Sequence, residues 1–357
     1  MTIAAVTLYR YALPLTEPLA LGDASLAERE GLLLRVRLEG GAVGWGDVAP
    51  LPGFSAETVE EAVAHARRLR TAWTGQRLPG DSLEAVLQAL PGLQEAPPSV
   101  QFGGESALVE AVADERGTSP AQLLGADRDE VVLNALVRTG TPAALAERGR
   151  RLREAGYRAV KLKVGRDAPP AEAERVWALR RALGPEIELR LDANRAWSLP
   201  DAIRFWEAID GADVAYVEEP VSDGASLPAF VDATGCPVAL DETTRDRSID
   251  VLAACPVRAV VLKPTLLGLR ATQDWAIAAR RQGAWPVLSA SYESGVGTRM
   301  LLALAAALSE APAGLLPYTR LATDVLVPRL SLEGPTIARS SLSRSAVAVE
   351  PLGDPLD

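Results

Sequence analysis

The fold is indicated by a stretch that reads YRAVKLKVGRDAPPAEAERVWALRRALGPEIELRLDAN at residues 157–194. Short apolar runs at 159–164 and 188–192 flank an amphipathic stretch at 170–183. A strand, a helix and a second strand of these lengths form a βαβ unit, in which the two strands lie parallel in one sheet. The stretch therefore predicts an α/β domain built on a parallel sheet.

The same alternation continues on both sides of this unit. Further strand candidates lie at residues 130–136, 214–218, 238–241, 259–263, 286–289 and 314–316. Helical patterns separate them, as at 142–155 and 199–209. Eight strand candidates within about 190 residues favour a (β/α) barrel over a doubly wound sheet. No Gly-x-Gly-x-x-Gly stretch follows a strand, so nothing indicates a dinucleotide site.

The residues before the barrel have a different pattern, in which extended segments are followed by helical ones. The extended segments, at 3–13, 31–38 and 41–45, predict an antiparallel meander, and the helical patterns lie at 55–74, 82–90 and 105–116. We therefore predict three parts. These are an α+β domain at 1–125, the barrel at 126–317, and a C-terminal segment at 318–357 that returns to the first domain.

Composition and charge exclude several classes of protein. The sequence has no apolar run of about 18 residues that could span a membrane and no secretory signal pattern, so we expect a cytoplasmic protein. A net charge of −10 argues against nucleic acid as a partner, but a small anionic substrate in a locally positive cavity remains compatible with it. The single histidine, His65, and the two cysteines, Cys236 and Cys255, cannot form a zinc site. Any metal must therefore be held by oxygen.

Lysine is used sparingly in this chain. Only three of the 37 basic residues are lysines, namely Lys161, Lys163 and Lys263. Arginine cannot practically lose its proton, whereas a buried lysine can do so and act as a base. Drift in base composition could have left three lysines by chance, but all three lie on two strand candidates. We therefore interpret them as functional.

Five consecutive strand candidates end in a charged residue, and barrel enzymes place their catalytic groups at the C-terminal ends of strands. These residues are Lys163, Asp192, Glu218, Asp241 and Lys263, which lie 22 to 29 residues apart. Lys161 and Arg190 each lie two residues before such an end and therefore share its face. We expect the whole set to meet at one rim of the barrel.

Three carboxylates that converge at a rim predict a metal site, because unpaired anions so close together would be destabilising. Asp192, Glu218 and Asp241 offer oxygen ligands in the number that suits Mg²⁺, with Mn²⁺ as a substitute. Lys163 and Lys263 would flank this site from opposite sides. The alternative is a salt-bridge network that closes the barrel end, although such a network would not require lysine in a chain that otherwise uses arginine.

At these residues the chain resembles the enolase superfamily, in its muconate-lactonizing subgroup. The resemblance is carried by Lys161-Leu-Lys163, Leu191-Asp-Ala-Asn194, Val217-Glu-Glu-Pro220, Leu240-Asp-Glu-Thr243 and Val261-Leu-Lys-Pro264. It covers most of the chain and implies a modified (β/α)₇β TIM-like barrel with an N-terminal α+β capping domain. Within the subgroup, residues 44–47, 51–55, 190–197 and 289–294 look most like the o-succinylbenzoate synthases.

Carried over by motif position, the resemblance implies a role for each rim residue. The metal ligands would be Asp192, Glu218 and Asp241, with Glu218 preferred to Glu219 and Asp241 preferred to Glu242. Lys163 would be the base, and Lys263 would stabilise the intermediate electrostatically. Lys161 would lie beside Lys163 as a candidate substrate contact, and its charge would help to keep Lys163 neutral by like-charge repulsion.

Several further residues are candidates for substrate contact, each with an ordinary structural alternative. Asn194 either reaches the site or begins the helix after its strand. Ser289 and Ser291 either hold a substrate carboxylate or serve as turn residues. Phe54 and residues 19–23 either cap the pocket or form plain surface loops.

The resemblance implies an enzyme that abstracts a proton beside the carboxylate of a small molecule. In o-succinylbenzoate synthases this step begins the dehydration of 2-succinyl-6-hydroxy-2,4-cyclohexadiene-1-carboxylate, through an enediolate, in menaquinone biosynthesis; the enzyme is a carbon–oxygen lyase. Two lysines that face one carbon also permit the reactions of N-acylamino-acid racemases and dipeptide epimerases, and muconate cycloisomerisation is a third alternative. A barrel that keeps its metal for stability or ligand storage, without catalysis, is the alternative from another class.

Overall fold

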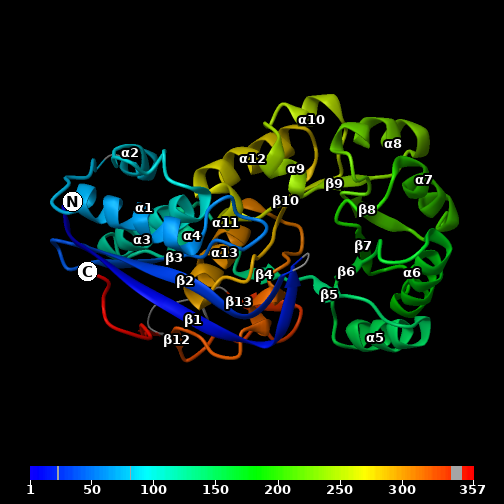
Figure 1. Cartoon of the computed structure of the whole chain (residues 1–357), viewed down its shortest axis with the longest axis horizontal. Helices are drawn as coiled ribbons and strands as arrows, with labels where there is room; N and C mark the ends of the chain where they lie inside the picture. The colour runs from blue at the N-terminus through cyan, green and yellow to red at the C-terminus, as the bar shows by residue number, and fades with distance from the viewer. Residues whose placement is uncertain (22–23, 81, 339–347) are drawn as a thin grey trace.

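The computed structural model describes residues 1–21, 24–80, 82–338 and 348–357. An antiparallel sheet with its helices forms one end of the molecule, and a barrel of parallel strands forms the rest (Figure 1). The N-terminus and the C-terminus lie at the same end, beside the first sheet (Figure 1). No helix in the described ranges is long and apolar enough to cross a membrane.

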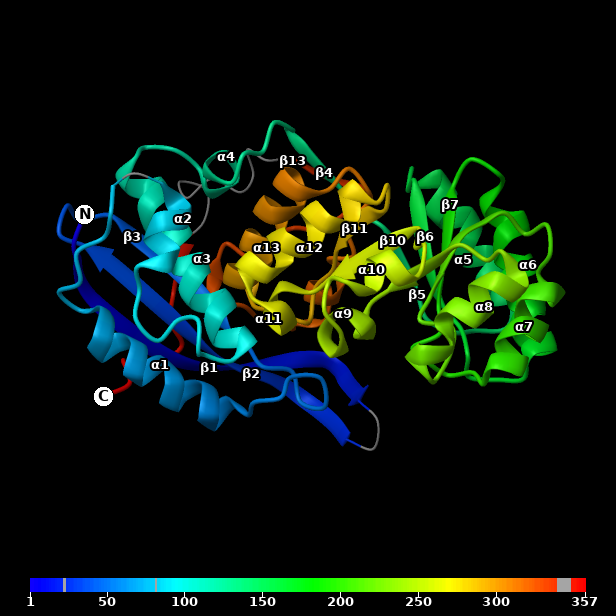
Figure 2. The same cartoon turned by 90° about the horizontal axis from the view of Figure 1, so that it is seen from above.

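The N-terminal part is a three-stranded meander covered by helices. Its elements are β1 (Ile3–Leu21), β2 (Ala24–Leu38), β3 (Val43–Val48), α1 (Val59–Trp73), α2 (Leu83–Gln88), α3 (Pro98–Glu115) and α4 (Pro120–Leu123). The predicted meander is present, but β1 and β2 extend beyond the predicted ranges 3–13 and 31–38. Figure 2 shows this longer hairpin, which extends away from α1 toward the barrel side of the molecule.

The ends of the hairpin were missed because they lack the alternation of apolar and polar residues that marks a strand. Pro14 and Pro18 interrupt the pattern, and proline cannot donate a ladder hydrogen bond. The pairing of β1 with β2 shifts its register between Pro14 and Leu19 and then resumes. Residues 22–23, between the two strands, lie outside the described ranges.

Two glycines explain how α3 packs on β3. A Cβ atom on Gly44 would overlap the α3 backbone at Ala107, and one on Gly46 would overlap the carbonyl of Gly103. The helix can therefore lie directly on the strand only because these positions have no side chain. The helix begins at Pro98, seven residues before the predicted start. The prediction began too late because Ser99, Gly103 and Gly104 are weak helix formers and obscure the helical pattern there.

The barrel contains seven parallel strands in the order β11-β10-β9-β8-β7-β6-β5. They are β5 (Ala135–Val137), β6 (Ala159–Lys163), β7 (Glu188–Asp192), β8 (Val214–Glu218), β9 (Val238–Leu240), β10 (Ala259–Leu262) and β11 (Trp285–Leu288). The first strand candidate, 130–136, is divided, because β4 (Glu130–Val132) pairs instead with β13 (Thr336–Ala338).

The barrel closes without a regular eighth strand. Residues 314–316 were predicted to form one, but only two isolated parallel bridges exist there, Leu133 with Ala313 and Ser289 with Gly314. The pairing ends at once because Leu316 begins a 3₁₀ helix, η2 (Leu316–Arg320), whose second residue is Pro317. The short segment 313–314 nevertheless joins β11 to the start of β5, so the modified (β/α)₇β barrel and its N-terminal α+β domain are confirmed.

Helices follow the strands and cover the outside of the barrel (Figure 2). They are α5 (Pro142–Glu154), α6 (Pro169–Leu183), α7 (Leu199–Ala208), α8 (Leu227–Thr234), α9 (Glu242–Asp246), α10 (Val251–Ala254), α11 (Pro264–Leu267), α12 (Leu269–Arg281) and α13 (Gly295–Leu308), with a short 3₁₀ turn η1 (Gly224–Ser226) before α8. The three helices predicted between strands, at 142–155, 170–183 and 199–209, are confirmed to within one residue at each end. Thr141 and Ser198 accept hydrogen bonds as N-caps of α5 and α7.

The C-terminal segment contacts the N-terminal part at several points. The Leu356 N–H donates to the carbonyl of Leu8, and the guanidinium of Arg70 donates to the carbonyl of Leu356 at 2.7 Å. Between these contacts and the barrel, β12 (Leu326–Val327) pairs with β14 (Ala348–Val349). The contacts agree with a returning segment, while the boundaries at 125 and 317 stay predictions.

The meander joins the two parts of the molecule through its two faces. Leu32, Leu34 and Val36 of β2 belong to an apolar core shared with α1 and α3, whereas Leu33 belongs to the barrel core. Alternate residues of a strand point to opposite faces. The meander is therefore buried on both sides and holds the N-terminal part firmly against the barrel.

Candidate active site

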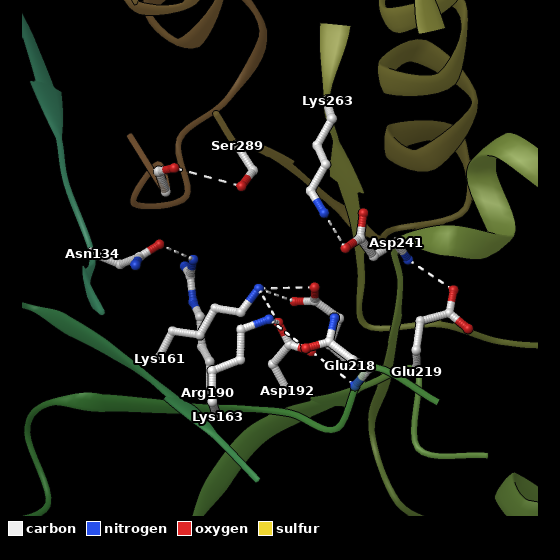
Figure 3. A network of polar contacts seen from close by, with 12 residues as sticks. Asn134, Lys161, Lys163, Arg190, Asp192, Glu218, Glu219, Asp241, Lys263 and Ser289 are labelled. Carbon is white, nitrogen blue, oxygen red and sulfur yellow. Dashed lines mark hydrogen bonds and ion pairs between the residues drawn. The ribbon is translucent and has the colours of Figure 1, made fainter. Parts of the chain in front are cut away.

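The ends of β6 to β10 bring all five predicted rim residues together beside a cavity (Figure 3). In the sheet, Lys163 lies beside Asp192, and Asp192 lies beside Glu218. The side chains of Asp192 and Glu218 are fully buried, and that of Asp241 is 4% exposed. Figure 3 shows Lys161 and Lys163 on one side of these carboxylates and Lys263 on the other.

Each carboxylate is paired with at least one lysine. The Nζ of Lys161 lies 2.6 Å from Oδ2 of Asp192 and 2.8 Å from both carboxylate oxygens of Glu218. The Nζ of Lys163 lies 2.6 Å from the same Oδ2 of Asp192, and Lys263 pairs with Asp241. The site therefore places three lysine amines against three buried carboxyl groups.

The charges in this cluster shift one another's pKa in opposite directions. Burial alone would raise the pKa of Asp192, but Lys161 and Lys163 outweigh it and hold that pKa well below its usual range. Burial, followed by the negative charge of Asp192, raises the pKa of Glu218 well above its usual range. Lys161 and Lys163 therefore stabilise the charged form of Asp192, whereas the charged form of Glu218 is disfavoured and would be stabilised by a further cation.

The carboxylates of the cluster also shift the pKa of two of the lysines. Burial disfavours the charge of Lys161, but Asp192 and Glu218 outweigh it and raise its pKa well above the usual value. The pKa of Lys263 is also raised, because Asp241 outweighs its burial. Lys161 and Lys263 are thus held as cations in the cluster as it stands.

Glu219 does not join the rim cluster. Its Oε1 accepts hydrogen bonds from the N–H groups of Asp241 and Thr243, at 2.9 and 2.7 Å, and its Oε2 lies 3.1 Å from Nε of Arg195. Glu219 therefore fixes the turn after β9, on which Asp241 lies. This arrangement supports the preference for Glu218 over Glu219 as a metal ligand.

Asn194 lies between the rim cluster and Glu242. Its Oδ1 accepts from the Nζ of Lys163 at 2.5 Å, and its Nδ2 donates to Oε1 of Glu242 at 3.1 Å. The residue has a left-handed backbone (φ 44°), which asparagine tolerates better than most residues. Asn194 therefore reaches the site, and α7 begins only later, at Leu199. Burial and then Asp241 raise the pKa of Glu242.

The donor set of the rim suits a hard divalent cation. In the part of the chain that the structure describes, no three acidic, histidine or cysteine side chains converge closely enough to hold a metal as they stand; the carboxylates are paired with lysines instead. However, Asp192, Glu218 and Asp241 are buried oxygen donors at consecutive strand ends, and burial and then the negative charge of Asp192 raise the pKa of Glu218. These features fit Mg²⁺ better than a softer metal.

The cavity in front of the cluster has a volume of about 510 Å³, within the range of small-molecule sites. The barrel contributes Asn194, Ser289 and Ser291 to its wall, and substrate contact by these three residues stays a prediction. The N-terminal part contributes Leu19, Leu51 and Phe54. Phe54 therefore lies at the pocket, whereas residues 22–23 of the other predicted cap segment, 19–23, fall outside the described residues.

Several polar residues near the cavity were not predicted as site residues. Asn134 lines the wall, and its Oδ1 lies 3.4 Å from the buried guanidinium of Arg190, which also donates to the carbonyl of Pro312. Arg138 and Arg166 line the wall as well. The predicted face of Arg190 is correct, because Arg190 lies two residues before Asp192 on β7. Nothing in the sequence distinguishes the other three.

Two family models match the chain. The model described as Enolase C-terminal domain-like matches residues 144–341, and the model described as MenC, N-terminal domain, matches residues 3–111. The first match covers most of the barrel, and the second covers most of the N-terminal domain.

Individual relatives agree with these matches. The o-succinylbenzoate synthase of Edwardsiella ictaluri (strain 93-146) is 35% identical over 307 residues, which cover 85% of this chain and 86% of that protein. Protein PHYLLO, chloroplastic, of Arabidopsis thaliana is 34% identical over 308 residues, which cover 77% of this chain and only 17% of that much longer protein. Among solved structures, a substrate-liganded complex of the L-Ala-D/L-Glu epimerase from Bacillus subtilis is 25% identical, with a TM-score of 0.82 over 95% of this chain and 96% of that one.

Proposed function

Because the chain belongs to the o-succinylbenzoate synthase family of the enolase superfamily, we propose that it catalyses the reaction for which that family is named. The reaction removes water from 2-succinyl-6-hydroxy-2,4-cyclohexadiene-1-carboxylate and yields o-succinylbenzoate in menaquinone biosynthesis. The enzyme would be a cytoplasmic carbon–oxygen lyase. One observation carries the proposal: Lys163 and Lys263 face a cavity from opposite sides, above three buried carboxylates.

Lys163 is the residue that we assign to proton transfer. Its neutral amine would remove the proton from the carbon beside the substrate carboxylate. The ammonium so formed would give a proton to the departing hydroxyl, which leaves as water. Lys161 contacts the same oxygen of Asp192, so this carboxylate keeps a cationic partner when Lys163 is neutral. Lys263 would stabilise the negative charge of the intermediate without moving a proton.

Asp192, Glu218 and Asp241 are the residues that we assign to the metal. Members of the enolase superfamily characteristically bind Mg²⁺, and the three carboxylates are oxygen ligands of the type that this ion prefers. When bound, Mg²⁺ would supply Lewis-acid stabilisation of the charge that develops on the substrate carboxylate. We propose Mn²⁺ as a substitute. Asn194, through its contact with Lys163, would orient the base.

An ultraviolet assay with the cyclohexadiene precursor and Mg²⁺ tests this function. Lys163→Ala should lower kcat by about 10²- to 10⁴-fold, the usual contribution of a general base. Lys163→Arg should be as inactive, because it keeps the charge but cannot accept a proton. The urea midpoint of unfolding of both variants should lie within a few tenths of 1 M of the wild-type midpoint. A Lys163→Ala variant with wild-type kcat would overturn the assignment.

Epimerisation is the second candidate, and the two opposed lysines favour it specifically. Lys163 and Lys263 could act on the two faces of one carbon, one removing a proton and the other delivering it. In that case the wild-type protein would be inactive with the cyclohexadiene precursor and would exchange deuterium into dipeptides or N-acyl amino acids. Tight Mg²⁺ binding without exchange into any carboxylate substrate would instead support a non-catalytic barrel.

A further inference from the structure

The wall of the cavity carries more positive charge than the catalytic lysines account for. Its basic residues are Arg138, Lys161, Lys163, Arg166 and Lys263. Glu242 is the only acidic residue among the described lining residues. Each lysine pairs with a buried carboxylate behind it. Within the described ranges, the guanidinium groups of Arg138 and Arg166 form no ion pair with an acidic side chain, although the chain has a net charge of −10.

Arg138 lies at the seam of the barrel. It follows β5 directly, and segment 313–314 closes the barrel between β5 and β11. Its Nη2 lies 3.4 Å from the hydroxyl of Tyr292, which follows β11 on the other side of the seam. Arg166 follows β6, the neighbouring strand. The three carboxylates that we assign to the metal, Asp192, Glu218 and Asp241, lie at the ends of β7, β8 and β9. Arg138 is therefore on the opposite part of the rim.

A buried hydroxyl lies on the same part of the rim. Ser291 is 2% exposed, lines the cavity, and its Oγ has no hydrogen-bond partner among the described residues. A buried polar atom without a partner is costly and is normally satisfied. Ser289, beside it, has only a long 3.5 Å contact to the carbonyl of Gly314. Both hydroxyls are therefore available to a ligand oxygen.

We propose that Arg138, positioned by Tyr292, forms a second anion subsite with Ser291, and that Arg166 adds a second cation at its edge. The subsite takes the carboxylate at the far end of the substrate from the reacting carbon. A planar guanidinium can bind a carboxylate through two parallel hydrogen bonds, and the serine hydroxyl can donate a third. This inference rests on the proposed function, whose substrate carries such a second carboxylate on its succinyl arm.

The subsite defines the substrate class by charge. It favours compounds with two carboxylates, one at the lysine–carboxylate cluster and one at Arg138. It disfavours compounds that place an ammonium group at the same point, such as the free N-terminus of a dipeptide, because Arg138 and Arg166 would repel it. Both arginines are exposed, so a ligand in the cavity can reach their guanidinium groups.

Calorimetric titration with Mg²⁺ present can test the subsite directly. The probes are o-succinylbenzoate and its analogue in which the side-chain carboxylate is a primary amide. The wild-type protein should bind the dicarboxylate about 10- to 100-fold more tightly than the amide, as expected for a charge-assisted hydrogen-bonded pair. Arg138→Gln should remove this preference while leaving the affinity for the amide unchanged. Arg281→Gln, which removes an exposed charge from α12 on the outside of the barrel, is the matched control and should keep the preference.

The outcomes separate the subsite from the proposed function. The subsite is wrong if Arg138→Gln still prefers the dicarboxylate to the amide as the wild-type protein does. It is also wrong if the wild-type protein shows no preference for the dicarboxylate. In both cases the function stands as long as the wild-type protein turns over the cyclohexadiene precursor. If the wild-type protein neither turns over the precursor nor binds o-succinylbenzoate, the function is wrong and the subsite falls with it. An equal loss of affinity for both probes in Arg138→Gln would indicate a structural role and would also overturn the subsite.

Discussion

Protonation of Glu105 should make the stability of this protein depend on pH. Glu105 lies on α3, is 2% exposed, and its Oε2 accepts the N–H of Leu269 at the start of α12 at 2.7 Å. It therefore joins the N-terminal domain to the barrel. Burial raises the pKa of Glu105 from 4.5 to about 7, although the N–H groups of Leu269 and Arg270 and the charge of Arg270 oppose this rise.

The sign of the effect follows from proton binding. Between pH 4.5 and 7 the folded chain keeps a proton on Glu105 that the unfolded chain has lost. The free energy of unfolding therefore decreases as the pH rises through this window. At about 1.36 kcal/mol per pKa unit, the full loss is about 3 kcal/mol, of which roughly 2 kcal/mol falls between pH 5.5 and 8.5.

Urea denaturation at pH 5.5, 7.0 and 8.5 can measure this effect. Glu105→Gln has nearly the same shape and stays neutral, so its free energy of unfolding relative to wild type should increase by roughly 2 kcal/mol from the lowest to the highest pH. Glu95→Gln, at an exposed position, controls for the loss of one negative charge. The reasoning is refuted if the difference between wild type and Glu105→Gln is the same at all three pH values.

Three further predictions concern other parts of the molecule. Asp47→Ala should lower the free energy of unfolding by about 3 kcal/mol or more, measured by urea denaturation, because the buried Tyr11 hydroxyl and the N–H and hydroxyl of Ser294 lose their acceptor; an unchanged midpoint would contradict this. Gly46→Ala should lower the thermal midpoint by at least about 5 °C, because its Cβ would overlap the carbonyl of Gly103; an equal or higher midpoint would show that α3 can shift. Chelation with EDTA should abolish turnover and Mg²⁺ should restore it, and activity that survives exhaustive chelation would exclude the metal assignment.

The strands that carry the site could be predicted because each ends at a charged residue after an apolar run. Asp192 and Glu218 are the last residues of β7 and β8, as the sequence indicated. The far part of the β1–β2 hairpin could not be predicted, since backbone pairing rather than apolar alternation defines it beyond Pro14. The strand predicted at 314–316 begins one residue later than the segment 313–314 that closes the barrel, and it is longer. A bridge of two residues leaves no periodic pattern from which its position could be predicted.

The site itself divides in the same way. Lys161, Lys163 and Lys263 are conspicuous in a chain that otherwise uses arginine, so their scarcity and their place at strand ends indicated them. Arg138 is one of many arginines, and only the closure of the barrel brings it to Tyr292. Residues that act through rare chemistry can be read from the sequence, whereas residues that act through common charges become visible only when their neighbours are known.

The loop after β11 depends on both domains for its position, which connects the N-terminal domain to substrate binding. From the N-terminal domain, Asp47 accepts two hydrogen bonds from Ser294. From the barrel, Glu293 accepts from the N–H of Ser291 and from the hydroxyl of Thr265, each at 2.6 Å. Thr265 lies two residues after Lys263, so Glu293 links the serine side of the cavity to the lysine side. Substitutions that loosen the N-terminal core can therefore raise KM without altering any residue that lines the cavity.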